Sequence, residues 1–309
     1  MINGIINVYK EKDYTSHDVV AKLRGILQQK KIGHTGTLDP QAEGVLPVCL
    51  GKATKVCDLL TDKDKEYQAV LLLGQTTDTQ DTTGTLLTQK NVTCTKVQVK
   101  EALKGFIGKY MQIPPMYSAL KVNGKKLCDL ARAGIEVERK PREVTIFSIE
   151  ILDISLPRIR MLVHCSKGTY IRTLCQDIGE KLGCGGCMES LIRTRVAEFQ
   201  QEDAWTLGQI QEHVQKIRQE HINLSGELLK DMIRPTDSVF LAYPKATVKE
   251  MFYKMLYNGN SLELEWLETC ETQNLEIPLR IYDIEGHFIG IYQFNRKHEN
   301  LKPIKIFME

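Results

Sequence analysis

The chain has 309 residues, 42% of them hydrophobic, and its 41 Lys and Arg against 39 Asp and Glu leave a net charge of +2. This length exceeds the usual size of one domain, so a large domain followed by a smaller one is expected, each with its own core. The balanced charge excludes neither protein nor RNA partners, because local patches decide polyanion binding. No apolar run is long enough to cross a bilayer, and residues 1–10 lack the features of a secretory signal.

The hydrophobic pattern predicts mixed α and β structure without internal repeats. Helices are expected over residues 16–29, 52–60, 169–182 and 206–218. Strands are expected over residues 67–73, 144–154 and 191–199. Within the third helix, Ile171, Leu174 and Ile178 lie on one stripe, which is typical of a helix that buries one face.

A domain boundary is expected between Tyr243 and Pro244, where a polar helical region gives way to short β-like runs broken by Gly286 and Gly290. The prediction is a first domain over residues 1–243 and a small β-rich domain over residues 244–309. The second domain has eight basic residues against ten acidic ones. Bulk electrostatics therefore do not favour RNA binding there.

The nine cysteines are odd in number and irregularly spaced, which favours a reduced compartment, the cytoplasm, over a disulfide framework. Cys184 and Cys187 form the one C-x-x-C pair. A structural zinc site would need a second Cys or His pair at matching spacing, and none is evident. No metal site is expected.

Residues 104–142 hold nine Lys and Arg against three acidic residues, a local net charge of +6. Such a segment could contact RNA phosphates, or it could be a solvated basic face. In the first case RNA binding should weaken steeply as salt rises.

Asp39 is the residue that most needs an explanation. Pro40 favours an extended backbone at Asp39, while Gly33, Gly36 and Gly44 permit turns and close backbone approach. A loop of this kind can hold a carboxylate still, as catalysis requires. Alternatively, an Asp-Pro pair often begins a helix, with Asp as the N-cap.

Five ordered blocks of the sequence resemble successive motifs of the TruB family of tRNA pseudouridine synthases. They are GHTGTLDPQAEGVLPVCLGKATK (33–55), KEYQAVLLLGQTTDTQDTTG (65–84), IPPMYSALKVNGKKLCDLARAGIEV (113–137), CSKGTYIRTLCQDIGEKLGCG (165–185) and LIRTRVAEF (191–199). The tail, with its GHFIGIYQF run, resembles in position the PUA-like RNA-binding domain of that family.

The resemblance implies an α+β pseudouridine synthase fold, with a mixed central sheet, flanking helices and a small PUA-like domain. It also implies an isomerase that converts uridine to pseudouridine at position 55 in the T loop of tRNA. The reaction breaks a C–N glycosidic bond, rotates the base and forms a C–C bond, without metal or cofactor. A cytoplasmic monomer without an obligate protein partner is expected, with residues 104–142 contacting the T arm.

By the same resemblance, Asp39 is the catalytic carboxylate, acting on the ribose by attack or by proton removal. Tyr67 would stack on the uracil and serve a late proton transfer, although a Tyr in an alternating strand is commonly a packing residue. Arg172 would pair with Asp39 and keep it charged, although a solvent-facing helix position is the simpler reading.

Four further residues match positions that bind the nucleotide or support the site in the family. His34 would seat the flipped base, Leu191 would line the uracil pocket, and Lys10 would support the loop or a phosphate. Tyr170 would contribute to substrate binding, although it is more typical of packing than of chemistry. The segment from Tyr9 to Ser16 lacks the Pro and Gly that the family has there.

A second class of function stays open, a tRNA-binding or tRNA-folding chaperone that uses the same surface without turnover. Loss of the Asp39 carboxylate separates the two, because a chaperone does not need it. A phosphate-binding loop at Gly51-Lys52 does not fit, since its spacing is wrong and Ala53 replaces the metal-contacting hydroxyl.

Overall fold

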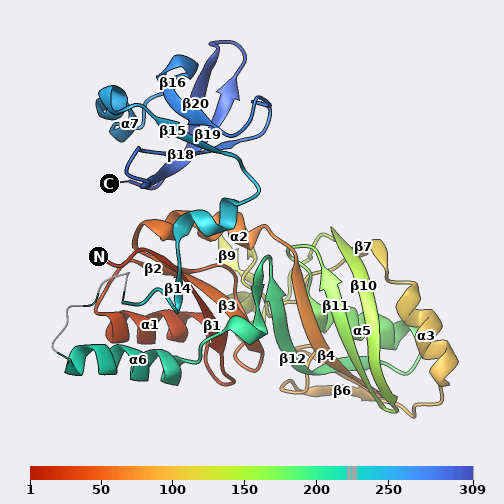
Figure 1. The fold of residues 1–309 in the computed structure, drawn as a ribbon. Helices are drawn as coiled ribbons and strands as arrows, with labels where there is room; N and C mark the ends of the chain where they lie inside the picture. Colours follow the sequence, from red (N-terminus) through yellow and green to blue (C-terminus); the bar gives the residue numbers. More distant parts are fainter. Residues whose placement is uncertain (221–223, 225–227, 309) are drawn as a thin grey trace.

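The computed structural model describes residues 1–220, 224 and 228–308. Glu309, the last residue of the predicted second domain, lies outside this description. The described chain forms a large α+β unit around a ten-stranded sheet and a smaller unit around a six-stranded sheet. Figure 1 shows the smaller β unit, in blue, above the large one.

The large sheet has the strand order β14-β1-β3-β12-β4-β11-β10-β7. Two short strands lie outside this order: β2 pairs with β3, and β13 pairs with β12. Its strands are β1 (Gly4–Lys10), β2 (Ile32–His34), β3 (Glu43–Leu50), β4 (Lys65–Leu73), β7 (Gly108–Gln112), β10 (Arg142–Ser155), β11 (Arg158–Cys165), β12 (Gly186–Val196), β13 (Phe199–Gln200) and β14 (Ile233–Arg234). The sheet is mixed, because β12 pairs parallel to β3 and antiparallel to β4. The pairing of β3 with β12 thus joins two halves of one sheet.

Two pairs of helices cover these halves. The helices α1 (Ser16–Leu27) and α6 (Leu207–Gln219) pack on β1 and β3, where Val19, Leu23 and Ile210 join a core with Val8 and Leu46. The helices α3 (Lys96–Lys104) and α5 (Ile171–Lys181) cover the other half. Each half therefore has its own apolar core, and the strands at the centre connect them.

Local signals define the helix ends well. Thr15 caps α1 in a reciprocal pair with Asp18, and the helix ends where Gln28 adopts a left-handed φ of 52°. Thr206 caps α6 in the same way. The predicted helix over 52–60 is instead a 3₁₀ turn (Gly51–Val56) followed by α2 (Cys57–Thr61).

The strand expected over 191–199 was misplaced. The structure has β12 beginning at Gly186, before the apolar run, and ending at Val196. The loop expected around Asp39 lies between β2 and β3, and the next part of the 33–55 segment, where no strand was expected, is the buried central strand β3. An almost wholly buried strand lacks the polar alternation by which strands are found.

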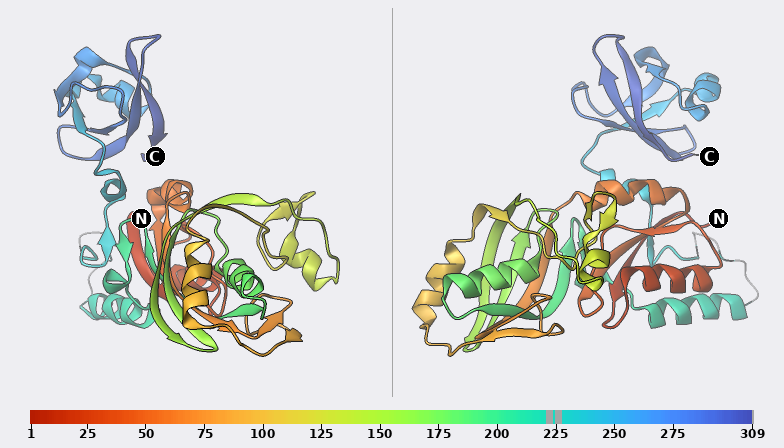
Figure 2. Two further views of the ribbon diagram at one scale, coloured as in Figure 1. Left: turned by 90° about the vertical axis from the view of Figure 1, so that its right-hand side faces the viewer. Right: turned by 180° about the vertical axis from the view of Figure 1, so that it is seen from behind.

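Residues 113–141 lie off the large sheet. They form the short pair β8 (Lys121–Val122) and β9 (Lys125–Lys126) and the helix α4 (Leu127–Arg132). The left view of Figure 2 shows this yellow-green segment projecting from the body. The predicted RNA-contacting insertion over 104–142 is too wide, because β7 and the start of β10 belong to the sheet. A second hairpin joins β5 (Gln75–Thr77) to β6 (Leu86–Gln89).

The smaller unit has the strand order β16-β20-β19-β18-β15-β17. Its elements are β15 (Lys245–Val248), α7 (Tyr253–Tyr257), β16 (Leu262–Glu263), β17 (Leu267–Cys270), β18 (Leu279–Tyr282), β19 (Phe288–Asn295) and β20 (Asn300–Ile306). This barrel-like arrangement is PUA-like. We propose that the chain divides between residues 243 and 244, because β15 begins directly after that point.

A substitution at Gly44 tests whether β3 and β12 lie in close contact where the two halves of the sheet join. Its φ is +107°, and a Cβ there would lie 2.2 Å from the Arg193 carbonyl oxygen on β12. Gly44→Ala should lower the free energy of unfolding by about 3 kcal/mol or more, through backbone strain and overlap. Urea denaturation followed by circular dichroism measures this change.

Gly25→Ala is the matched control, because Gly25 lies on α1 and a Cβ there meets nothing within 4 Å. This substitution should raise the free energy of unfolding by about 0.5–1 kcal/mol. Equal stabilities of the two variants would contradict the close approach of β3 and β12.

Candidate active site

Asp39 lies in the loop that links β2 to β3. The loop is tied to α1, because the Leu38 amide donates to the Ser16 hydroxyl at 2.9 Å. It also closes on itself, since the Ala42 amide donates to the Asp39 carbonyl at 3.0 Å. No helix follows Pro40, so the alternative that Asp39 caps a helix is wrong.

Arg172 forms an ion pair with Asp39 across 133 residues of sequence. Its Nε lies 2.9 Å from Oδ2, and its second terminal nitrogen lies 3.4 Å from Oδ1. The Arg172 side chain is 6% exposed and the Asp39 carboxylate is 40% exposed. The alternative of a solvent-facing Arg172 is therefore wrong, and the geometry presents a charge-paired carboxylate to an opening.

The same guanidinium connects two further segments. Arg172 donates to the Thr79 carbonyl at 2.9 Å and to the Tyr117 carbonyl at 2.8 Å. Its Nε also lies 3.9 Å from the largely buried Asp81 carboxylate. The sequence pattern did not single out Asp81, although this residue lies in the polar turn of the 65–84 block that resembles the family.

A cavity of about 350 Å³ opens beside Asp39 and Arg172. Tyr67, Tyr170 and Leu191 line it. Tyr67 is 9% exposed, and burial raises the pKa of its phenol. The Tyr170 backbone is held by both polar atoms of the Gln112 side chain, at 2.8 and 3.0 Å. A concave site with an apolar wall and a few polar groups suits a planar base.

Lys10 and His34 do not line this cavity. Lys10 lies behind the loop, fully buried, and its ammonium donates to the carbonyls of Glu11, Tyr14 and Pro40 at 3.1, 2.6 and 3.2 Å. Burial lowers its pKa to about 8. His34 lies edge-on to His17, with its Nδ1 accepting from the Gly36 amide at 3.3 Å.

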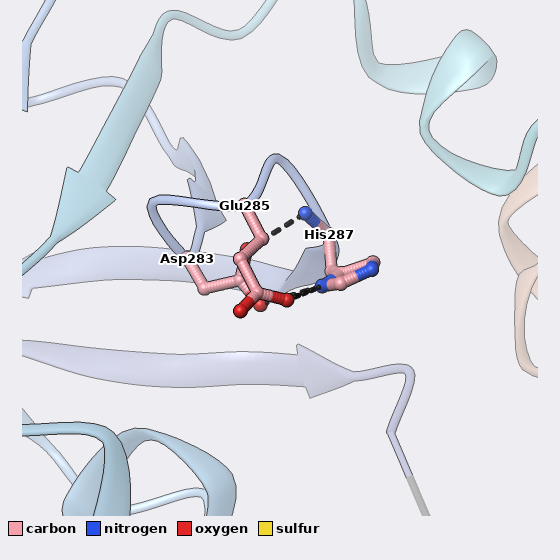
Figure 3. A group of neighbouring side chains, drawn as sticks. All are labelled: Asp283, Glu285 and His287. Carbon is pink, nitrogen blue, oxygen red and sulfur yellow. Dashed lines mark hydrogen bonds and ion pairs between the residues drawn. The ribbon is translucent and has the colours of Figure 1, made fainter. Parts of the chain in front are cut away.

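Cys184 and Cys187 belong to no cluster of three or more ligating side chains within residues 1–220, 224 and 228–308. The cluster found there consists of Asp283, Glu285 and His287 in the smaller unit. Figure 3 shows the His287 ring turned toward the carboxylates. The Asp283 carboxylate already accepts from the Tyr257 hydroxyl and from the backbone and ring nitrogens of His287. These hydrogen bonds explain why the three side chains lie together: they stabilise the turn over residues 283–287.

Comparisons with known proteins agree with this geometry. The family model described as TruB family pseudouridylate synthase (N terminal domain) matches residues 24–171, and tRNA pseudouridylate synthase B C-terminal domain matches residues 172–241. The chain belongs to the TruB family.

Curated relatives match along the whole length. The tRNA pseudouridine synthase B of Lachnoclostridium phytofermentans is 53% identical, covering 99% of this chain and all of the relative. That of Alkaliphilus oremlandii is 44% identical, covering 99% of this chain and 97% of the relative. Among solved structures, a Cbf5-Nop10-Gar1 complex aligns with a TM-score of 0.74 at 27% identity, covering 99% of this chain and 85% of that chain.

Lys10 tests whether the loop needs its buried support. Lys10→Met removes three hydrogen bonds, one of them to the carbonyl directly after Asp39, so the carboxylate should lose its fixed position. The single-turnover rate of pseudouridine formation should fall about 10- to 100-fold, because a small displacement of a reacting group slows the reaction strongly. The affinity for tRNA should change little. Lys12→Met, an exposed change in the turn that follows β1, should keep the wild-type rate. Equal rates of the two variants would contradict the role of Lys10.

Proposed function

We infer that this protein isomerises uridine to pseudouridine in tRNA, with the T-loop uridine at position 55 as its target and Asp39 as its catalytic carboxylate. Membership of the TruB family supports the reaction and the substrate class. The observation that carries the assignment to Asp39 is its bidentate pair with buried Arg172 at the edge of a base-sized cavity. The enzyme is then a tRNA pseudouridine(55) synthase.

The residues divide the chemistry between them. The target base must leave its stack, at a cost of a few kcal/mol that contacts in the pocket offset. The base would then lie between Tyr67 and Leu191, while the Asp39 carboxylate faces the ribose. Arg172 holds that carboxylate in place by a charge-assisted pair. Asp39 could attack the ribose or remove a proton from it, and both routes use the same geometry.

The tRNA must also be bound by residues outside the cavity. Lys121, Lys125 and Lys126 are exposed on the projecting segment over residues 113–141. Tyr117 in this segment accepts a hydrogen bond from Arg172, so the segment is continuous with the active site. We propose that it contacts the phosphates of the T arm.

The expected setting is a cytoplasmic monomer without an obligate protein partner. All nine cysteines are free thiols, which suits a reducing compartment. No helix in the described parts of the chain is long and apolar enough to span a membrane. Light scattering after size exclusion tests the monomer.

Asp39→Asn provides the decisive test of the activity. The amide keeps the shape of the side chain but removes the negative charge, so pseudouridine formation should fall below detection while tRNA binding persists. Carbodiimide labelling with primer extension on an unmodified tRNA transcript locates the product. If wild type binds the transcript but forms no pseudouridine, a tRNA-folding chaperone is the better account.

The salt dependence of tRNA binding tests whether the projecting segment contacts phosphates. Replacement of Lys121, Lys125 and Lys126 by Ala should weaken tRNA binding, and should reduce the slope of log affinity against log salt by about 0.7–0.9 for each phosphate that the variant no longer binds. Filter binding between low and moderate salt measures both quantities. The same triple change made at Lys245, Lys249 and Lys254 in the smaller unit is the control, and an equal weakening there would contradict the assignment.

A further inference from the structure

Four residues that are register partners on neighbouring strands form a row across the large sheet beside the active site. Lys10 on β1 pairs with Gly44 on β3, Gly44 pairs with Arg193 on β12, and Arg193 pairs with Tyr67 on β4. Cross-strand partners point to the same face of a sheet. Arg193 therefore lies beside the cavity residue Tyr67, and both side chains line the cavity.

Arg193 is buried without a carboxylate partner in the described chain. It is 1% exposed, and its guanidinium donates to two backbone carbonyls, Val45 at 2.7 Å through Nε and Gly36 at 3.4 Å. No ion pair to Arg193 occurs among the described residues. The guanidinium also has a side-chain hydrogen bond with Tyr67. A buried charge without a carboxylate partner is costly, so the presence of an arginine at this position calls for a functional reason.

The neighbour that can supply the negative charge is Tyr67. Burial raises the pKa of its phenol, and the guanidinium of Arg193 opposes that rise. The other charged or titratable groups that act on the phenol are Cys165 on β11 and Asp39 in the loop, and both raise its pKa. Arg193 is thus the group that favours a phenolate in this setting.

We propose that Arg193 is a positioning residue of the reaction, which stabilises the Tyr67 phenolate that accepts the proton from C5 of the reattached base. The proposal rests on the proposed function. When C1′ bonds to C5, that carbon still carries its hydrogen. The C5–H bond then breaks, its proton passes to the Tyr67 oxygen and on to water, and its electron pair restores the ring double bond. N1, which left C1′ with the bonding pair, takes a proton from water, so nothing is oxidised or reduced.

The carbonyl contacts explain why an arginine occupies this position. Its five N–H groups form a rigid fork, and the bonds to Val45 and Gly36 fix the plane of that fork. One terminal nitrogen would be 3.7 Å from a Cβ at Gly36, so the fork also borders the loop that carries Asp39. A purely structural role would be to brace this loop, and the experiment must separate the two roles.

The test compares single-turnover rates on tRNA transcripts made with uridine or with 5-deuterouridine. Arg193→Gln keeps hydrogen-bond donors for the two carbonyls but removes the charge. The rate should fall about 100-fold, as for loss of an acid–base partner, and deuterium at C5 should slow the remaining reaction at least twofold. Arg193→Lys, which keeps the charge, should recover most of the rate and lose most of the isotope effect.

Arg195→Gln is the matched control, because Arg195 lies on the same strand but pairs with Asp64 at 3.1 Å. It should react like wild type with both transcripts. A slow Arg193→Gln variant with no isotope effect at C5 would overturn the proposal and leave Arg193 as a brace of the loop.

Tyr67→Phe keeps the proposal testable if Arg193→Gln does not fold. This variant lacks the proton acceptor, so it should also show a C5 isotope effect of at least twofold, and absence of that effect would overturn the proposal. Failure of the proposed function is distinguishable, because wild type would then form no pseudouridine from either transcript.

Discussion

The ion pair between Asp39 and Arg172 is the interaction on which the rest of the site depends. Arg172 is almost wholly buried, and a buried guanidinium must be fully bonded to be tolerated. It meets that requirement with Asp39, with the Thr79 and Tyr117 carbonyls and with nearby Asp81. Three segments that are remote in sequence therefore converge on one side chain at the start of α5.

The mixed sheet supplies the rigidity that this convergence needs. The strand β12 lies between β3, which follows the Asp39 loop, and β4, which carries Tyr67. Since its pairing with β3 is parallel and its pairing with β4 is antiparallel, β12 joins the two halves of the large unit. Residues from both halves can then face one cavity with positions fixed by strand register.

The smaller unit is joined to the wall of that cavity. Phe288 and Phe307 share an apolar cluster with Val56 and Leu60 of the large unit, and Lys305 binds the Asp58 carboxylate at 2.7 and 2.8 Å. The helix α2 that receives these contacts ends at Thr61, which lines the cavity. With more acidic than basic residues, the smaller unit contributes a packed support at this boundary rather than a basic surface.

The sequence by itself determined the local features, because these depend on neighbouring residues: the capped helices that begin after Thr15 and Thr206, the constrained loop around Asp39, and the motifs of the family. Only the tertiary structure decided which distant side chains meet. The pairing of Arg172 with Asp39 and the support of the loop by Lys10 were anticipated through the resemblance alone. The approach of Asp81 to Arg172 and the row from Lys10 to Tyr67 through Arg193 were not anticipated. Strand order and register create those contacts, and the pattern of a single strand does not encode its neighbours.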